Sequence, residues 1–187
     1  MEKFKKENKK SGFSIVETLV AIFILSLVIT AAMTVAQGSL QASFYARDRI
    51  LATFLAQEAI ELVKNRRDKN GLSESPWLAG LGACASSVGC ALSPRNFGLV
   101  SGCDQNGEKI CNLCRDTNDG DILVPCDGRS GLEESGLTRS LKLRYIPDED
   151  SANEAEITAT VTWANKARKV VITEHIFNWH PFSALEE

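Results

Sequence analysis

The stretch that decides the fold runs from Leu19 to Ala36 and reads LVAIFILSLVITAAMTVA. It contains no charged residue and no proline, and it lies inside a longer uncharged run, Thr18 to Ala46. A bilayer core about 30 Å thick needs roughly 20 helical residues, so this stretch is long enough to span it. We therefore expect a membrane-spanning helix near the N-terminus.

The charges on either side of this run predict its orientation. The first twelve residues carry five lysines and two glutamates, a net charge of +3, whereas the rest of the chain carries −6. Lysines beside a membrane helix tend to stay on the cytoplasmic side. We expect the N-terminus in the cytoplasm and the remainder exported. No strongly basic domain is present, so we predict no direct nucleic-acid partner.

Glu17 stands at the start of the apolar run, where a carboxylate is costly unless it has a partner or a function. Two simple interpretations leave it unexplained. The first is a secretory signal cut after Thr34-Val35-Ala36, although the apolar core of such signals is usually only about 7–15 residues. The second is a single-pass anchor for an unrelated exported domain.

A third interpretation accounts for Glu17. The stretch from Lys9 to Val20, KKSGFSIVETLV, closely resembles the class III signal of type IV prepilins and type II secretion pseudopilins. In that family a membrane peptidase cuts after a glycine and methylates the new N-terminal residue, which is most often phenylalanine. The resemblance makes Gly12 the last leader residue, Phe13 the methylated N-terminus, and Glu17 the fifth residue of the mature chain.

The resemblance also implies how subunits assemble. Cleavage would free an α-amine at Phe13, whose reference pKa of about 7.7–8.0 keeps it largely cationic. In that family the glutamate of one subunit pairs with the N-terminal amine of a neighbour. The implied partners are other pilin subunits, a prepilin peptidase, an assembly ATPase and a platform protein. Many major pilins have a mid-helix proline, but residues 32–38 contain only Gly38 as a soft point, which favours a minor pilin or pseudopilin.

Helical periodicity continues beyond the apolar run. An apolar stripe recurs at spacings of four and seven, formed by Leu40, Phe44, Leu51, Leu55 and Leu62 and widened by Ile50, Phe54 and Val63. Basic residues at 64–67 and Asn70-Gly71 favour a helix end there. We expect one helix from Phe13 to about Arg67, roughly 80 Å long, whose second half packs on an exported head.

Composition changes between Gly71 and Gly136. This region holds eleven of the thirteen glycines and all six cysteines: Cys84, Cys90, Cys103, Cys111, Cys114 and Cys126. An even number of clustered cysteines in an exported chain favours disulfides, and six allow 15 pairings that the sequence leaves open. We expect a long irregular region held by these bonds.

Strand patterns follow. Alternation appears at 140–145 and at 157–163, then Asn165-Lys166 offers a turn before a third apolar strand at 168–179. The predicted fold class is α+β, a long N-terminal helix packed on a small antiparallel sheet. The expected segments are a leader (1–12), a membrane and assembly half-helix (13–38), an amphipathic half-helix (39–70), the Gly/Cys-rich region (71–136), the sheet (137–180) and a tail (181–187).

Other sites carry weaker signals. Cys111-x-x-Cys114 with Cys103 and Cys126 has no recognised zinc spacing. Residues 116–121, DTNDGD, resemble a calcium loop with glycine one place early and Asp127 where glutamate is expected. The two histidines, His175 and His180, have no evident nucleophile beside them. We predict no metal, cofactor or catalytic residue.

The sequence as a whole predicts a structural subunit of a type IV pilus or type II secretion-like filament. It would reside first in the cytoplasmic membrane and then in a filament at the cell surface or in the periplasm. The alternative is a membrane-anchored, exported, disulfide-held binding domain that does not assemble. The mature N-terminus distinguishes them: methylated Phe13 for the filament, Gln37 for a signal peptide, and Met1 for a plain anchor.

Overall fold

The computed structural model describes residues 12–95, 99–103, 111–120, 122–146 and 153–179. The chain divides into two compact units, Met1–Arg47 and Asp48–Glu187. Helix α1 (Ile15–Leu72) contributes to both. The leader and the tail lie outside the described residues, except that the leader's last residue, Gly12, is described.

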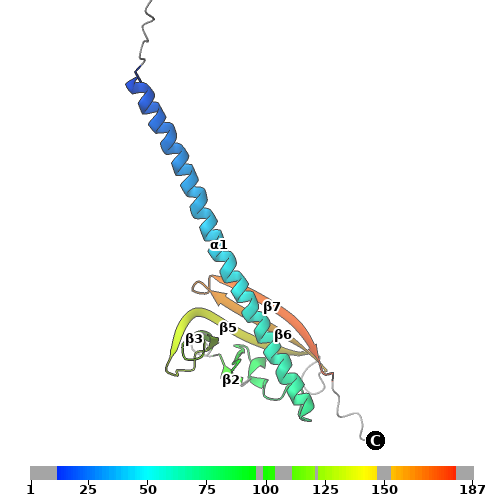
Figure 1. The fold of residues 1–187 in the computed structure, drawn as a ribbon. Coiled ribbons are helices and arrows are strands. Elements are labelled where there is room, and N and C mark those ends of the chain that lie inside the picture. The colour runs from blue at the N-terminus through cyan, green and yellow to red at the C-terminus, as the bar shows by residue number, and fades with distance from the viewer. Residues whose placement is uncertain (1–11, 96–98, 104–110, 121, 147–152, 180–187) are drawn as a thin grey trace, which may run out of the picture. The chain divides into compact units, whose positions relative to one another are not determined.

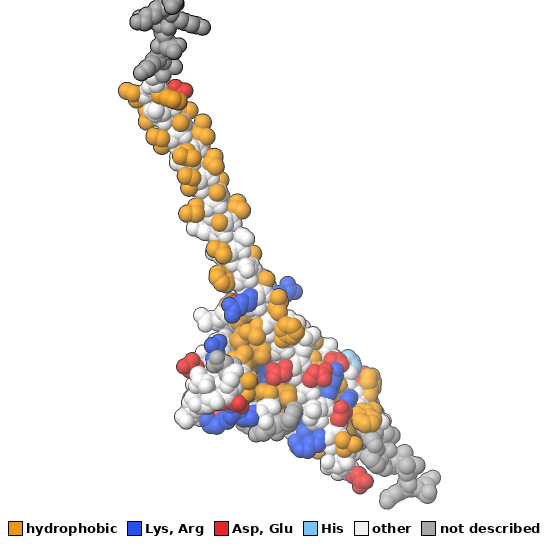
Figure 2. Space-filling model, in the orientation of Figure 1, with side chains coloured by type: hydrophobic (Ala, Val, Ile, Leu, Met, Phe, Trp, Pro, Cys, Tyr) orange, Lys and Arg blue, Asp and Glu red, His pale blue; other side chains and the backbone are white. Residues whose placement is uncertain are grey.

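The described part of the first unit is the beginning of α1 and the three residues before it. Every residue from Gly12 to Arg47 is exposed, so this part of the chain has no core of its own. Figure 2 shows apolar side chains over the visible face of this part of the helix, and the run from Thr18 to Ala46 has no charged residue on any face. A helix that is apolar on all sides requires lipid or other helices around it.

The second unit contains the end of α1, a short 3₁₀ helix η1 (Gly82–Ala85) and a seven-stranded antiparallel sheet. Its long strands are β5 (Leu132–Ile146), β6 (Glu154–Trp163) and β7 (Arg168–Phe177). They pair in the order β5-β6-β7, and α1 lies across one face of the sheet (Figure 1). The predicted fold class and the antiparallel meander are confirmed.

Strand β6 shows why alternation was a dependable signal. Its inward residues Ala155, Ile157, Ala159, Val161 and Trp163 are buried, whereas the residues between them are partly exposed. Side chains of a strand point alternately to opposite faces, so a sheet with one buried face produces this pattern. The β6–β7 turn follows as expected, with positive φ at Ala164, Asn165 and Lys166.

The region between the helix and β5 is more ordered than the sequence predicted. It contains four short strands: β1 (Cys90–Leu92), β2 (Leu99–Gly102), β3 (Asn112–Asp116) and β4 (Ile122–Pro125). Both β1 and β3 pair with β5, and β2 and β4 lie outside them. Strands of three to five residues are too short for alternation to be recognised, so an irregular region was the expected outcome.

The helix meets the sheet through a different set of residues from the predicted stripe. Leu55, Leu62 and Val63 are buried as expected, but Ile50, Leu51 and Phe54 are exposed. The other buried apolar residues of α1 are Ala52, Ala56, Ala59 and Ile60. Three alanines have little apolar surface to mark a stripe, yet their small side chains allow the helix to approach the sheet closely.

Disulfides are present and their pairing is sequential. Cys84 bonds Cys90, Cys103 bonds Cys111, and Cys114 bonds Cys126. Cα–Cα distances of 4.5, 5.4 and 5.1 Å lie within the usual range for disulfides. The bonds join η1 to β1, the residue after β2 to the residue before β3, and β3 to the residue after β4, so each one holds a short strand.

Candidate processing and assembly site

The predicted cleavage point lies just before α1. Residues 12–14 are outside the helix, which begins at Ile15. Gly12 has no atom within 4 Å of where a side chain would begin, and the Phe13 side chain is 79% exposed. The Gly12–Phe13 peptide bond is therefore neither held in the helical hydrogen-bond ladder nor covered by described side chains.

Glu17 lies in the first turn of α1. A carboxylate at this end of a helix interacts favourably with the partial positive charge of the unpaired backbone N–H groups. The turn is closed by two bonds from Thr18, whose backbone N–H donates to the Ser14 carbonyl at 3.1 Å and whose hydroxyl donates to the Ile15 carbonyl at 2.8 Å. The first turn thus presents one carboxylate near the two exposed residues of the cleavage point.

The hydroxyl groups farther along the apolar run are satisfied within the helix. Ser26 donates to the Ile22 and Phe23 carbonyls, Thr30 to the Ser26 carbonyl, and Thr34 to the Ala31 carbonyl, all at 2.7–2.9 Å. Because each of these hydroxyls has an acceptor within its own helix, it can lie in an apolar environment without an unsatisfied hydrogen-bond donor. Glu17 remains the one charged side chain between Phe13 and Ala46.

By length and composition, α1 can cross a membrane. The most apolar 18-residue window has a mean hydropathy of 2.6, and none of it is buried. A buried core helix of a soluble protein would pass the same test with its apolar residues covered. The apolar surface at the start of α1 has no cover among the described residues.

These features can be compared with known families. Residues 8–33 match the prokaryotic N-terminal methylation motif. The chain carries this motif. It spans Gly12, Phe13 and Glu17, and together with the long apolar helix it is consistent with the type IV pilin family. Neither a search of curated proteins nor a search of solved structures found a match.

The methylation motif carries three general consequences. It supports a pilin-like substrate of a prepilin peptidase, and it points to a structural subunit and not to an enzyme. With the apolar helix it also points to membrane anchoring with an exported head. The lysines of the leader, residues 3–10, lie outside the described residues.

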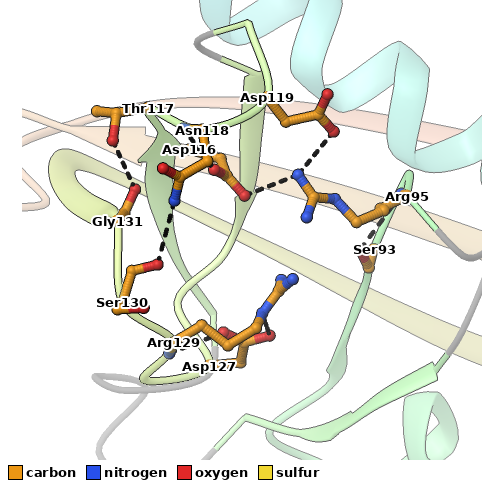
Figure 3. Close-up of polar contacts among 10 residues, drawn as sticks. All are labelled: Ser93, Arg95, Asp116, Thr117, Asn118, Asp119, Asp127, Arg129, Ser130 and Gly131. Carbon is orange, nitrogen blue, oxygen red and sulfur yellow. Dashed lines mark hydrogen bonds and ion pairs between the residues drawn. The ribbon is translucent and has the colours of Figure 1, made fainter.

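The acidic residues of the calcium-like stretch in the second unit contact a neighbouring arginine. The Arg95 guanidinium lies 2.7 Å from carboxylate oxygens of both Asp116 and Asp119, as Figure 3 shows. This ion pair engages two acids of the calcium-like stretch, and the Asp116 side chain is nearly buried. Asp121 lies outside the described residues.

Cysteine and histidine contacts likewise have structural explanations. Cys111 and Cys114 belong to two different disulfides, so their thiolates are not available for zinc. The Nδ1 atom of His175 lies 2.6 Å from Glu154, and its Nε2 atom 3.6 Å from Glu156. Glu156 also accepts hydrogen bonds from Arg144, which lower its pKa. His180 lies outside the described residues.

One buried ionic contact was not anticipated. The Arg139 side chain is 1% exposed and donates to the Glu58 carboxylate at 2.6 Å and to the Leu92 carbonyl at 3.0 Å. Burial lowers the pKa of Arg139, and the Glu58 charge opposes that effect. A signal was available, because Arg139 is two residues before Leu141 and therefore shares the inward face of β5.

Proposed function

We propose that this protein is a minor pilin or pseudopilin, a structural subunit of a type IV pilus or type II secretion-like filament. The observation that carries the proposal is the close grouping of an exposed Gly12–Phe13 bond, a first-turn Glu17 and an uncovered apolar helix within a methylation motif. A plain anchor requires only the last of these features.

The precursor inserts with its lysine leader in the cytoplasm. Prepilin peptidase cuts after Gly12 and methylates the new amine at Phe13. An assembly ATPase and a platform protein then move the subunit from the bilayer into a filament, which extends to the cell surface or into the periplasm. The apolar helix exchanges lipid for the helices of other subunits, so its surface remains covered throughout.

Glu17 aligns neighbouring subunits during this transfer. The Phe13 amine would stand at the positive end of the helix dipole, where a cation is disfavoured and a carboxylate is favoured. In an apolar bundle an unpaired charge is costly, so the carboxylate of one copy and the amine of the next stabilise each other only in the correct axial register.

Mass spectrometry of the N-terminal peptide from cells that express prepilin peptidase tests the processing. We expect methylated Phe13. An intact Met1 would indicate a plain anchor, and Gln37 a conventional signal peptide; either result would refute the proposal.

Filament incorporation tests the role of Glu17. The Glu17→Gln variant keeps the size of the side chain and removes its charge, so we expect normal membrane insertion and loss from sheared filaments. Thr18→Ala is the matched control, because the Thr18 hydroxyl bonds only within its own turn. Normal incorporation of Glu17→Gln would contradict the alignment role.

A further inference from the structure

We propose that the end of the second unit where the chain enters it binds the anionic headgroups of the membrane surface. Its basic residues are Arg49 on α1 and Lys166, Arg168 and Lys169 at the β6–β7 turn, all exposed. We call these four residues the basic end. This inference rests on the membrane-anchored precursor of the proposed function but not on cleavage or assembly.

The β6–β7 turn lies level with the first helical residues of this unit. Arg139 on β5 contacts Leu55 and Glu58 of α1, and it is in register with Val161 and Val170 across the sheet. Toward the other end of β7, Glu174 pairs with Lys64 at 2.8 Å. Strand β7 and α1 therefore advance in the same direction.

From this register the position of the turn follows. Ala164 is three strand residues beyond Val161, or about 10 Å. The same distance back along α1 from Glu58 is about seven residues, which reaches Leu51. Lys166, in the turn, thus lies near the level of Leu51, close in height to Arg49, and Arg168, which is in register with Trp163, lies about one strand residue farther along.

Apolar side chains are exposed at the same level. Ile50 is 57%, Leu51 41% and Phe54 63% exposed, although they belong to the unit that has a core. Basic residues beside exposed aliphatic and aromatic side chains are the composition of surfaces that lie at a membrane interface. If this end of the unit faced only water, its exposed apolar side chains would have no use.

The uncharged run that precedes the second unit is long enough to cross a bilayer together with its headgroups. Thr18 to Ala46 comprises 29 residues, about 44 Å of helix, which matches the roughly 40–45 Å of a bilayer with its headgroups. The second unit begins at Asp48, two residues later. The chain therefore enters this unit close to the membrane surface.

The charge balance favours an anionic partner. Among the described residues, Asp48 precedes Arg49 and Glu134 lines a groove together with Lys166, so the four cations of the basic end outnumber these two acids. Each cation close to an anionic membrane surface strengthens binding by about fivefold. The lipid surface is permanently present beside an anchored precursor, so we assign it as the occupant and not a second protein.

The experiment uses the full-length precursor in vesicles of phosphatidylcholine alone or with about one-third phosphatidylglycerol. A fluorophore on Ala167→Cys reports collisions with headgroup-attached quenchers, and a fluorophore on Ser73→Cys, at the other end of the helix, is the control position. We expect at least a threefold stronger quenching at 167 than at 73 in anionic vesicles. Raising salt from about 0.15 M to about 1 M, which shortens the Debye length from about 8 to about 3 Å, should remove most of it.

A charge variant and its control identify the cause. Lys166→Gln/Arg168→Gln/Lys169→Gln should reduce quenching at 167 to the level in neutral vesicles. Neutralising three exposed cations elsewhere, Lys69, Arg115 and Lys142, should leave it unchanged. Equal quenching in neutral and anionic vesicles would overturn the proposal, as would quenching that falls when the protein is diluted in lipid, which would indicate contact with another copy. Unprocessed protein suffices, so failure here leaves the N-terminal analysis unaffected.

Discussion

The Arg139 guanidinium and the Glu58 carboxylate lie 2.6 Å apart and join β5 to α1. Arg139 is buried, whereas the Glu58 side chain is 38% exposed, so the pair reaches from the core to the surface. The guanidinium also donates to two backbone carbonyls, from Nη1 to Leu55 and from Nη2 to Leu92. A buried cation with this many acceptors makes the packing of helix on sheet specific, because a shifted helix would leave it unpaired.

Removing the acid should therefore cost more than an ordinary surface ion pair. Glu58→Ala leaves the Arg139 charge buried without its partner, and we expect the free energy of unfolding to fall by about 2–4 kcal/mol. Arg144→Gln, which removes the exposed pair with Glu156, should change it by less than about 1 kcal/mol. Urea unfolding followed by tryptophan fluorescence measures both. Equal effects would show that the buried pair adds nothing to stability.

Peptide mapping without reduction should recover three linked pairs, 84–90, 103–111 and 114–126. Replacing Cys114 and Cys126 together by alanine should lower the free energy of unfolding by about 2–3 kcal/mol, because it releases a loop of twelve residues in the unfolded chain. The reduced wild-type protein should lose at least as much. A peptide that links Cys111 to Cys114 would contradict the pairing.

The β6–β7 turn contains a removable source of strain. Lys166 has a φ of 67°, a region that glycine occupies without cost, and it follows Asn165, which also has positive φ. Lys166→Gly should raise the free energy of unfolding by about 0.5–1 kcal/mol. The same substitution at Lys69, inside α1, should lower it by about 1 kcal/mol. A loss of stability at Lys166 would mean that the side chain contributes more than the strain costs.

The Asp68 carboxylate should stabilise the fold in a way that depends on pH. Burial alone would raise its pKa, but hydrogen bonds from Arg67 and from Trp179, at 2.8 and 2.9 Å, outweigh burial and lower it below the usual 3.8. A carboxyl group whose pKa is lowered by folding stabilises the fold fully when the pH is above its pKa in the unfolded chain. That stabilisation disappears as the pH falls through its pKa in the folded protein. Between about pH 5 and pH 2 the wild-type melting temperature should fall more steeply than that of Asp68→Asn. Parallel slopes would exclude this role for Asp68.

The candidate site was accessible from the sequence because all of it is local. Gly12, Phe13 and Glu17 lie within six residues of one another, so their relation depends on chain spacing and on the onset of one helix. The methylation motif predicted from these residues is confirmed, whereas their roles in cleavage and alignment remain proposals. The long strands could also be predicted from the sequence, since apolar and polar residues alternate in β5, β6 and β7 over enough positions to show a period of two.

What escaped prediction depends on contacts between distant residues. Three alanines of α1 form much of its contact with the sheet, and alanine carries too little apolar surface to mark a face. Strands β1 and β3 are ordered by pairing with β5, β2 and β4 by pairing with β1 and β3, and disulfides hold these short strands, which have no recognisable pattern of their own.

Composition and short-range spacing alone established an uncharged membrane-length helix, a processing motif at its start and an antiparallel sheet after it, because each depends on neighbouring residues. Tertiary structure decided which cysteines bond, which side of α1 is covered and how a buried arginine is neutralised. Those outcomes depend on which side chains meet in space, since a disulfide forms only between cysteines held a few ångströms apart and a buried charge persists only beside its partner.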